Sequence, residues 1–262
     1  RKSNTMKKAI FSTEISLLRS TMQRLLRRSA HANISKILRK THQADVALIM
    51  RNLNQYEQKI IFSLCPTALH KARLLEELDE SLIEKVLGNE SSKSISKIFS
   101  YLDTNDQATI ISMFAEKRQS EILTAIEADD KEEVEEIMSY PDDSAGSIMT
   151  KETFTLNQNT TVKQSIKKLQ SFPENDKIFY LYVLDNKEKL VGVVSLRTLV
   201  TSNNSKKLRD VMIKDIQAAT TDTDQEEVAK KVAQYNYLAL PVVNRQNRFL
   251  GIVTIDDVVD II

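Results

Sequence analysis

Hydrophobic residues in the first half of the chain recur at helical spacing. In residues 44–65 and again in residues 94–114, apolar positions follow one another at intervals of three, four and seven. In both segments a short polar break, Asn54-Gln55 or Thr104-Asn105, separates two helices, and Asp103 or Thr104 is suited to cap the second helix of its pair. Repeated helix pairs predict an all-α superhelical domain over 41–140, preceded by a basic amphipathic helical segment, 1–40.

The pattern changes after Tyr140, where short β-branched and aromatic runs replace the helical rhythm. Residues 178–185 (IFYLYVLD) and 190–196 (LVGVVSL) form one pair of such runs, and 238–244 (LALPVVN) and 249–255 (FLGIVTI) form a second pair with the same internal spacing. The flanking segments correspond as well. The second half is therefore predicted to be an internal duplication, 141–205 and 206–262, and each copy reads strand, helix, strand, strand, helix.

Composition agrees with a folded, multidomain α and α+β protein. The chain has 262 residues, 41% hydrophobic and 28% charged, which is enough for two or three domains with cores of their own. Its single cysteine, Cys65, excludes an internal disulfide and suits a reducing compartment. The sequence contains neither an apolar run of eighteen residues nor a secretion signal, so no membrane span is predicted within it.

The net charge of +1 hides two oppositely charged blocks. Residues 1–40 carry eleven Lys and Arg against Glu14 alone, and residues 121–152 carry eleven acids against Lys131 and Lys151. The acidic block is either a solvated face or a block that needs a counter-ion, which would be a basic neighbour or a divalent cation. Nucleic acid would suit the basic block, but no recognition motif or aromatic interleaving accompanies it, so no nucleic-acid partner is predicted.

Catalytic chemistry is not predicted. The three histidines and Cys65 are scattered along helical segments at spacings that fit no zinc site. The chain lacks a nucleophile elbow and a phosphate-binding loop. These observations exclude the common enzyme motifs, and the chain is predicted not to be an enzyme.

The duplicated half resembles a tandem pair of CBS domains, on the evidence of residues 240–262 (LPVVNRQNRFLGIVTIDDVVDII) and their weaker counterpart. The resemblance implies a regulatory module that often binds an adenine nucleotide such as ATP, with an acid three positions after a Ser or Thr contacting the ribose. Thr254 and Asp257 satisfy that pattern, whereas the first copy has Ser195 and Thr198, and a hydroxyl cannot replace a carboxylate that accepts two hydrogen bonds. A CBS pair that serves packing alone remains an alternative.

Over about residues 30–262 the chain resembles the cytosolic region of MgtE magnesium channels. The most specific segment is 140–150 (YPDDSAGSIMT), which matches the family's junction between its N domain and its first CBS domain. The resemblance implies a Mg²⁺-sensing region on the cytoplasmic face of the cell membrane that gates a transmembrane channel domain of the same chain, so the sequence is expected to be a soluble fragment that stops before the membrane-connecting helix. It also implies a homodimer formed through the CBS pairs, with an apolar face that we expect to include Val228, Val232, Val258, Val259 and Ile261.

Candidate Mg²⁺ ligands follow from this resemblance residue by residue. They are the carbonyl of Gly146 and the carboxylates of Asp224, Glu226, Asp257, Asp260 and Asp106. Mg²⁺ prefers such oxygen ligands, and cations placed between acidic domains would reduce their mutual repulsion and let them approach. Gln234 and Asn236 stand where the family has acids, which predicts that one site between the CBS domains is lost or weakened. The alternative function is a CBS pair that senses an adenine nucleotide and acts on another protein.

Overall fold

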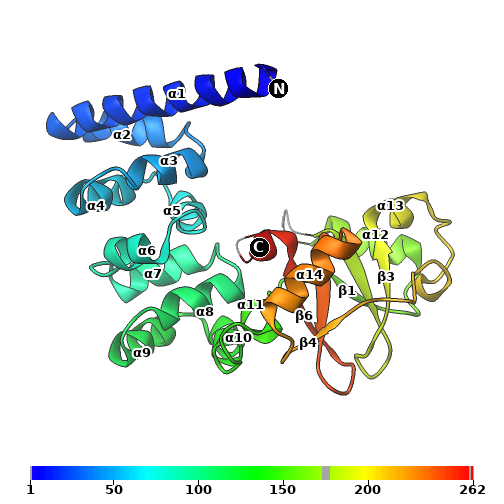
Figure 1. The fold of residues 1–262 in the computed structure, drawn as a ribbon. Helices are drawn as coiled ribbons and strands as arrows, with labels where there is room; N and C mark the ends of the chain where they lie inside the picture. The colour runs from blue at the N-terminus through cyan, green and yellow to red at the C-terminus, as the bar shows by residue number, and fades with distance from the viewer. Residues whose placement is uncertain (1, 173–177, 260, 262) are drawn as a thin grey trace. The chain divides into compact units, whose positions relative to one another are not determined.

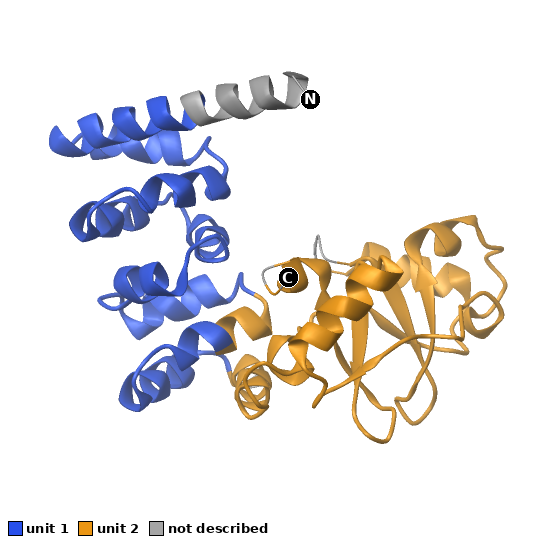
Figure 2. Cartoon of the chain, viewed as in Figure 1, with its two compact units in different colours: residues 1–102, 109–127 blue, residues 103–108, 128–262 orange. Residues whose placement is uncertain are grey.

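The computed structural model describes residues 2–172, 178–259 and 261, apart from the side chains of residues 2–13 and 129. The chain divides into two compact units (Figure 2). Unit 1 holds residues 1–102 and 109–127, and unit 2 holds residues 103–108 and 128–262. The first turn of the helix Thr104–Ser112 therefore belongs to unit 2, while the rest of that helix belongs to unit 1. None of the helices in the described ranges is both long enough and apolar enough to span a membrane.

Unit 1 is entirely helical, as the periodicity predicted (Figure 1). Its helices are α1 (Lys2–Arg27), α2 (His31–Leu38), α3 (Gln43–Met50), α4 (Gln55–Ser63), α5 (Ala68–Leu75), α6 (Glu80–Leu87), α7 (Ser92–Phe99), α8 (Thr104–Ser112) and α9 (Glu116–Ala125). Helix α1 packs on α2 and α3, and the stack continues from α3 to α5, α7 and α9, with α4 packed on α6 beside it. This layered stack of helix pairs confirms the predicted superhelical domain.

Local sequence signals set where these helices begin. Asn54 caps α4 through a capping box with Glu57, whose side chain accepts from the Asn54 backbone N–H at 3.1 Å. Helix α8 begins at Thr104, and the carbonyl of Asp103 accepts the first intrahelical hydrogen bond from the N–H of Gln107 at 3.0 Å. Of the two residues that the sequence offered as the cap of α8, Asp103 therefore occupies the capping position.

Unit 2 contains the predicted duplication. After α10 (Ala128–Met138) and α11 (Ala145–Ile148), the first repeat consists of β1 (Thr155–Asn157), α12 (Val162–Gln170), β2 (Tyr180–Leu184), β3 (Leu190–Ser195) and α13 (Leu196–Thr201). After a 3-10 turn, η1 (Leu208–Asp210), the second repeat consists of β4 (Ala219–Thr220), α14 (Gln225–Tyr235), β5 (Ala239–Val243), β6 (Phe249–Thr254) and α15 (Ile255–Val259). In each three-stranded sheet the first strand is parallel to the second, and the second is antiparallel to the third.

The two repeats are interlocked through the segments that precede them. Thr150, ahead of the first repeat, pairs with Ile252 in the second sheet, and Ile213, ahead of the second repeat, pairs with Val193 in the first sheet. Each leading segment thus extends the edge of the other repeat's sheet. Because backbone hydrogen bonds cross between the repeats in both directions, we expect unit 2 to fold as one body and not as two separate domains.

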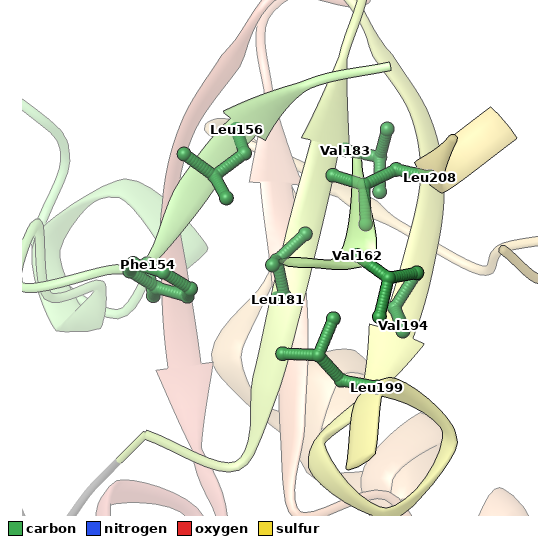
Figure 3. Packing of buried hydrophobic residues seen from close by; sticks show 8 residues of the cluster. All are labelled: Phe154, Leu156, Val162, Leu181, Val183, Val194, Leu199 and Leu208. Atoms are coloured by element: carbon green, nitrogen blue, oxygen red, sulfur yellow. The ribbon is translucent and has the colours of Figure 1, made fainter. Parts of the chain in front are cut away.

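Two cores hold the repeats. The core of the first repeat, shown in Figure 3, places side chains from its strands against α12, α13 and η1: Phe154, Leu156, Val162, Leu181, Val183, Val194, Leu199 and Leu208. Strand residues alternate between faces, so Tyr182 points the other way, into a second core with Leu190, Ala239, Val243 and Ile252. This second core draws on both repeats and joins their sheets.

The apolar face that we expected on the CBS pair is mostly internal. Val228, Val232 and Val258 are buried within unit 2 itself, so they cannot form part of an outer face. Val259 remains 63% exposed, and Val200, which occupies the equivalent position on α13 of the first repeat, is 71% exposed. The expectation that the apolar face includes all five residues is wrong for these three, because α14 and α15 pack them inward within unit 2.

Candidate functional site

The junction that follows α10 is fastened to the second repeat. Ser144 caps the short helix α11 in a capping box with Ser147. The N–H of Ala145 donates to the carbonyl of Thr223 at 2.7 Å, and the N–H of Gln225 donates to the carbonyl of Asp143 at 2.9 Å. These bonds tie the acidic junction to the start of α14.

Gly146 has a packing role in this junction. The residue is buried, and no glycine in the described chain has a positive φ, so Gly146 is not required by an unusual backbone conformation. A Cβ at this position would lie 2.5 Å from Cγ of Tyr140, whose hydroxyl donates to Glu136 at 3.0 Å. The absence of a side chain lets the Tyr140 ring cover the junction. The N–H of Gly146 donates to the carbonyl of Thr221 at 3.0 Å.

Asp224 and Glu226 lie beside this junction at the beginning of α14. Asp224 caps the helix, and its Oδ1 accepts from the N–H of Glu226 at 2.8 Å. Its backbone forms an isolated bridge with Ser144, two residues before Gly146. Glu226 is exposed and pairs with Lys230 at 3.5 Å. Three predicted Mg²⁺ ligands, Gly146, Asp224 and Glu226, therefore occupy adjoining segments of unit 2.

Asp257 is held by three hydrogen-bond donors. Its Oδ2 accepts from the N–H of Thr254 at 3.1 Å and from the hydroxyl of Thr254 at 2.6 Å. Its Oδ1 accepts from the side-chain amide of Asn105 at 3.0 Å. Thr254 is fully buried, and its hydrogen bonds fix the first turn of α15. The pattern predicted for a ribose contact is thus present, with its carboxylate already engaged within the protein.

Asn105 is a hydrogen-bond partner of Asp257 that the sequence did not predict. Its amide also donates to the carbonyl of Ile148 at 3.3 Å, so it joins α8 to both α11 and α15 within unit 2. The side chain is buried, and its amide oxygen has no hydrogen-bond partner. The predicted ligand Asp106 follows directly in the first turn of α8 and is half-buried. A helix-start asparagine carries no sequence signal for this role, because the contact spans 152 positions along the chain.

A lysine within the acidic block pairs with one of its acids. Lys151 forms an ion pair with Glu136, and Glu152 accepts hydrogen bonds from the hydroxyls of Thr104, at 2.8 Å, and Thr150. This answers part of the charge question raised by the sequence: Lys151 supplies the counter-ion for some of the acids in the block.

Repulsion nevertheless remains in this block. Burial raises the pKa of Glu133 above its ordinary range; Lys151 opposes that shift, while the carboxylates of Glu152, Asp130 and Glu136 add to it. A raised pKa means that the ionised form of Glu133 is disfavoured in the folded state. The neighbouring carboxylates thus add to the desolvation cost of ionising Glu133.

The raised pKa of Glu133 predicts a stabilising substitution. The folded-state pKa of Glu133 is raised, so its contribution to stability is present below the ordinary pKa of Glu and is lost as the pH rises through the raised pKa. Glu133→Gln is therefore expected to raise the midpoint temperature of unfolding at neutral pH. At about pH 4, where the Glu133 side chain of the parent is mostly protonated, the substitution is expected to leave that temperature unchanged. Glu132→Gln, which removes the adjacent acid on the same helix, is the matched control. An equal gain from both variants at neutral pH would contradict this account.

Those predicted ligands that the structure describes lie in two regions of unit 2. Within the described ranges, no three His, Cys, Asp or Glu side chains are grouped so that they could hold a metal. Gly146, Asp224 and Glu226 form one region of unit 2, and Asp257 lies in another, next to α8. Asp260 lies outside the described residues.

The amide at position 236 has a structural explanation. Asn236 ends α14 in the left-handed conformation, with φ 54°, and the following N–H of Tyr237 donates to the carbonyl of Val232 at 3.1 Å. Asparagine tolerates this conformation better than most residues. The helix cap therefore accounts for the asparagine at the position where the resembling family has an acid.

Comparison with known families follows the same division of the chain. Residues 41–143 match the family described as the MgtE intracellular N domain, and residues 145–203 and 208–262 match the CBS domain. The magnesium transporter MgtE of Bacillus subtilis is 34% identical over 220 residues, which cover 79% of this chain and 49% of that protein. MgtE of Thermus thermophilus is 40% identical over 131 residues, or 50% of this chain and 29% of that protein. The chain spans about half, or less, of the length of these relatives.

Solved structures agree over nearly the whole chain. The cytosolic domain of the Mg²⁺ channel MgtE in complex with ATP superposes with a TM-score of 0.87 at 28% identity, covering 93% of this chain and all of that one. The soluble part of a magnesium transporter superposes with a TM-score of 0.79 at 22% identity, covering 94% of this chain and 97% of that one, and supports the fold alone.

Proposed function

Because this chain belongs to the MgtE family, as an intracellular N domain followed by two CBS domains, we propose that it is a Mg²⁺-responsive region that gates ion flow through a membrane-embedded part of the same protein. The observation that carries this proposal is the match in order and fold to the cytosolic domain of a Mg²⁺ channel along the full length of that domain. The chain is a regulatory region of a transporter and not an enzyme.

The acidic surfaces of unit 2 supply a mechanism for the response. Desolvation is the main cause of the raised pKa of Glu133, and the carboxylates of Glu152, Asp130 and Glu136 add to it. Divalent cations at such surfaces reduce repulsion between neighbouring charges and so favour the state in which acidic elements lie close together. In our proposal, millimolar Mg²⁺ favours a closed association of the N domain with the CBS pair, and withdrawal of Mg²⁺ releases it. Asp106, Asp224, Glu226, Asp257 and Asp260, with the carbonyl of Gly146, are the proposed ligands.

Asp257 is the position at which this mechanism can be tested with least damage to the fold. Asp257→Asn removes the charge but keeps an oxygen that can accept from Thr254. The new amide would face the amide of Asn105. Rotation of the Asn105 amide would bring its unpartnered oxygen toward the new amide, in exchange for the 3.3 Å hydrogen bond to the carbonyl of Ile148. The variant is thus expected to fold while lacking one proposed ion contact.

Small-angle scattering of the purified chain, titrated with MgCl₂ and with NaCl of equal ionic strength, tests the proposal. The parent is expected to become more compact with millimolar Mg²⁺ only, and Asp257→Asn is expected to show a reduced change. Glu84→Gln, which removes an exposed acid on α6 of unit 1, should respond like the parent. A parent chain whose radius of gyration ignores Mg²⁺ would exclude the proposed response, and an Asp257→Asn variant indistinguishable from Glu84→Gln would exclude Asp257 as a ligand.

The same measurement reports the molecular mass and therefore the oligomeric state. We propose a homodimer formed through the CBS pairs, because Val200 and Val259 stay exposed at equivalent positions of α13 and α15. Two exposed valines related by the internal duplication are the kind of surface that association would cover. The forward scattering of the parent is expected to correspond to twice the chain mass, and a monomer's mass with and without Mg²⁺ would contradict the dimer.

A nucleotide-sensing function is the second candidate. Two observations support it: the side chains of Thr254 and Asp257, the pair expected to contact a ribose, are hydrogen-bonded to each other, and a similar cytosolic domain was solved with ATP. A ribose at Asp257 would have to share or replace the hydrogen bonds from Asn105 and Thr254. Thermal denaturation with ATP in the absence of Mg²⁺ distinguishes the two functions. Only nucleotide sensing predicts that ATP alone raises the thermal midpoint of the parent and that Asp257→Asn abolishes this increase.

A further inference from the structure

The outer stripe of α1 combines exposed basic residues with an exposed apolar one. Among residues whose side chains are described, Leu17, Ser20, Arg24 and Arg27 follow one another at intervals of three or four, so they share one face of the helix, and all four are exposed. Leu17 is 68% exposed, whereas Met22, on another face, is fully buried. Since α1 packs on α2 and α3 through its other faces, no described helix of unit 1 covers this stripe.

A second basic group stands on the neighbouring helix. Lys36, Arg39 and Lys40 at the end of α2 repeat the spacing of Arg24, Arg27 and Arg28 at the end of α1. All six side chains are exposed, and none of the ion pairs found in the described part of the chain involves them. We call these six cations together with Leu17 the basic end-face of unit 1.

Helix polarity explains only part of this arrangement. Cations in the last turn interact favourably with the negative end of a helix dipole, and several of the six occupy last turns. The helix dipole does not explain the exposed leucine on the same stripe. It also does not explain why acids are scarce: residues 14–40 contain seven Lys and Arg and a single acid, Glu14. Six cations without anionic partners indicate a surface that meets an anion outside the chain.

We propose that the basic end-face binds the anionic surface of a phospholipid bilayer. Clustered Lys and Arg are attracted to acidic headgroups, and an apolar side chain on the same helical stripe can enter the headgroup region. RNA fits less well, because residues 14–40 contain no Phe, Tyr or Trp on which bases could stack. The proposal rests on the proposed function, which places the chain beside the membrane that holds the rest of the protein.

Sedimentation of the purified chain with vesicles tests the proposal. The assay compares phosphatidylcholine vesicles with vesicles that also contain phosphatidylglycerol, in EDTA so that Mg²⁺ does not screen the lipid. The parent is expected to bind only the anionic vesicles and to dissociate as NaCl is raised. Arg24→Gln/Arg27→Gln/Arg28→Gln should weaken the partition coefficient by at least about tenfold. Lys163→Gln/Lys167→Gln/Lys168→Gln, which removes three exposed cations from α12, is the matched control and should bind like the parent.

Several outcomes would overturn the inference. It fails if the parent ignores anionic vesicles, if both triple variants lose binding equally, or if single-stranded RNA binds the parent while vesicles do not. It also fails if the arginine variant changes only the oligomeric mass, because the end-face would then bind a second copy of the chain. Small-angle scattering of the arginine variant with MgCl₂ distinguishes a failure of this inference from a failure of the proposed function. If the parent chain does not bind vesicles and the arginine variant still becomes compact with Mg²⁺ like the parent, only the lipid-binding role of the basic end-face is rejected.

Discussion

Replacing Tyr182 by alanine is expected to cost unit 2 about 3–5 kcal/mol of unfolding free energy, the range for deletion of a large buried aromatic side chain. Tyr182 is only 2% exposed and lies in the core that contains residues of both sheets. Its ring stacks on Phe249 of the second repeat, with centroids 5.1 Å apart. The cavity left by the alanine substitution would therefore lie in the core that joins the two repeats. Urea denaturation of the full chain, followed by circular dichroism, measures the loss.

Tyr182→Phe is the matched control for this prediction. It keeps the ring and removes only the hydroxyl, which is buried without a hydrogen-bond partner. Burial accordingly raises the pKa of Tyr182 far above its ordinary range. Because an unsatisfied buried hydroxyl costs about 1–3 kcal/mol, the phenylalanine variant is expected to match or exceed the parent in stability. A loss from Tyr182→Phe as large as that from Tyr182→Ala would show that the hydroxyl, and not the ring, stabilises the core.

Gly251→Ala is expected to destabilise unit 2 by about 2–3 kcal/mol, near the upper end of the range for overpacking. A Cβ at Gly251 would lie 2.5 Å from the backbone carbonyl oxygen of Thr150. That carbonyl accepts from the N–H of Ile252 at 3.0 Å, so it cannot retreat without breaking the bridge between the leading segment and β6. Thermal denaturation of the full chain would report the change.

The internal duplication provides the control for Gly251. Gly192 holds the same place in the first repeat, since Val183 pairs with Gly192 as Val242 pairs with Gly251. A Cβ at Gly192 would meet the side chain of Met212, with the sulfur at 2.2 Å. The thioether and Cγ of Met212 can rotate aside, whereas its Cβ, at 2.9 Å, has to shift slightly with the backbone. Gly192→Ala is therefore expected to cost about 1–2 kcal/mol, less than Gly251→Ala. Equal losses at the two glycines would contradict the distinction between a backbone and a side-chain obstacle.

Much of the candidate site lay beyond what a sequence pattern can reveal. The acids Asp224 and Asp257 were predicted from motifs, and the structure shows each at the beginning of a helix, where short-range hydrogen bonds hold it. Asn105 was missed, because its partner belongs to a helix at the other end of the chain. Lys151 was visible as a rare cation in an acidic block, but its ion pair with Glu136 depends on how α10 packs.

By itself, the sequence determined the local elements and the duplication. Hydrophobic spacing, turn residues and capping side chains act over a few positions, and they were sufficient to predict stacked helix pairs in 41–140 and two strand-helix-strand-strand-helix copies after Tyr140. Only the tertiary structure showed that the leading segment of each repeat pairs with the sheet of the other repeat. It also showed that the Tyr140 ring packs where a side chain at position 146 would lie, and that Val228 and Val232 face inward. The physical reason is that these outcomes depend on which surfaces meet in space, and a periodic pattern identifies an apolar face without specifying what covers it.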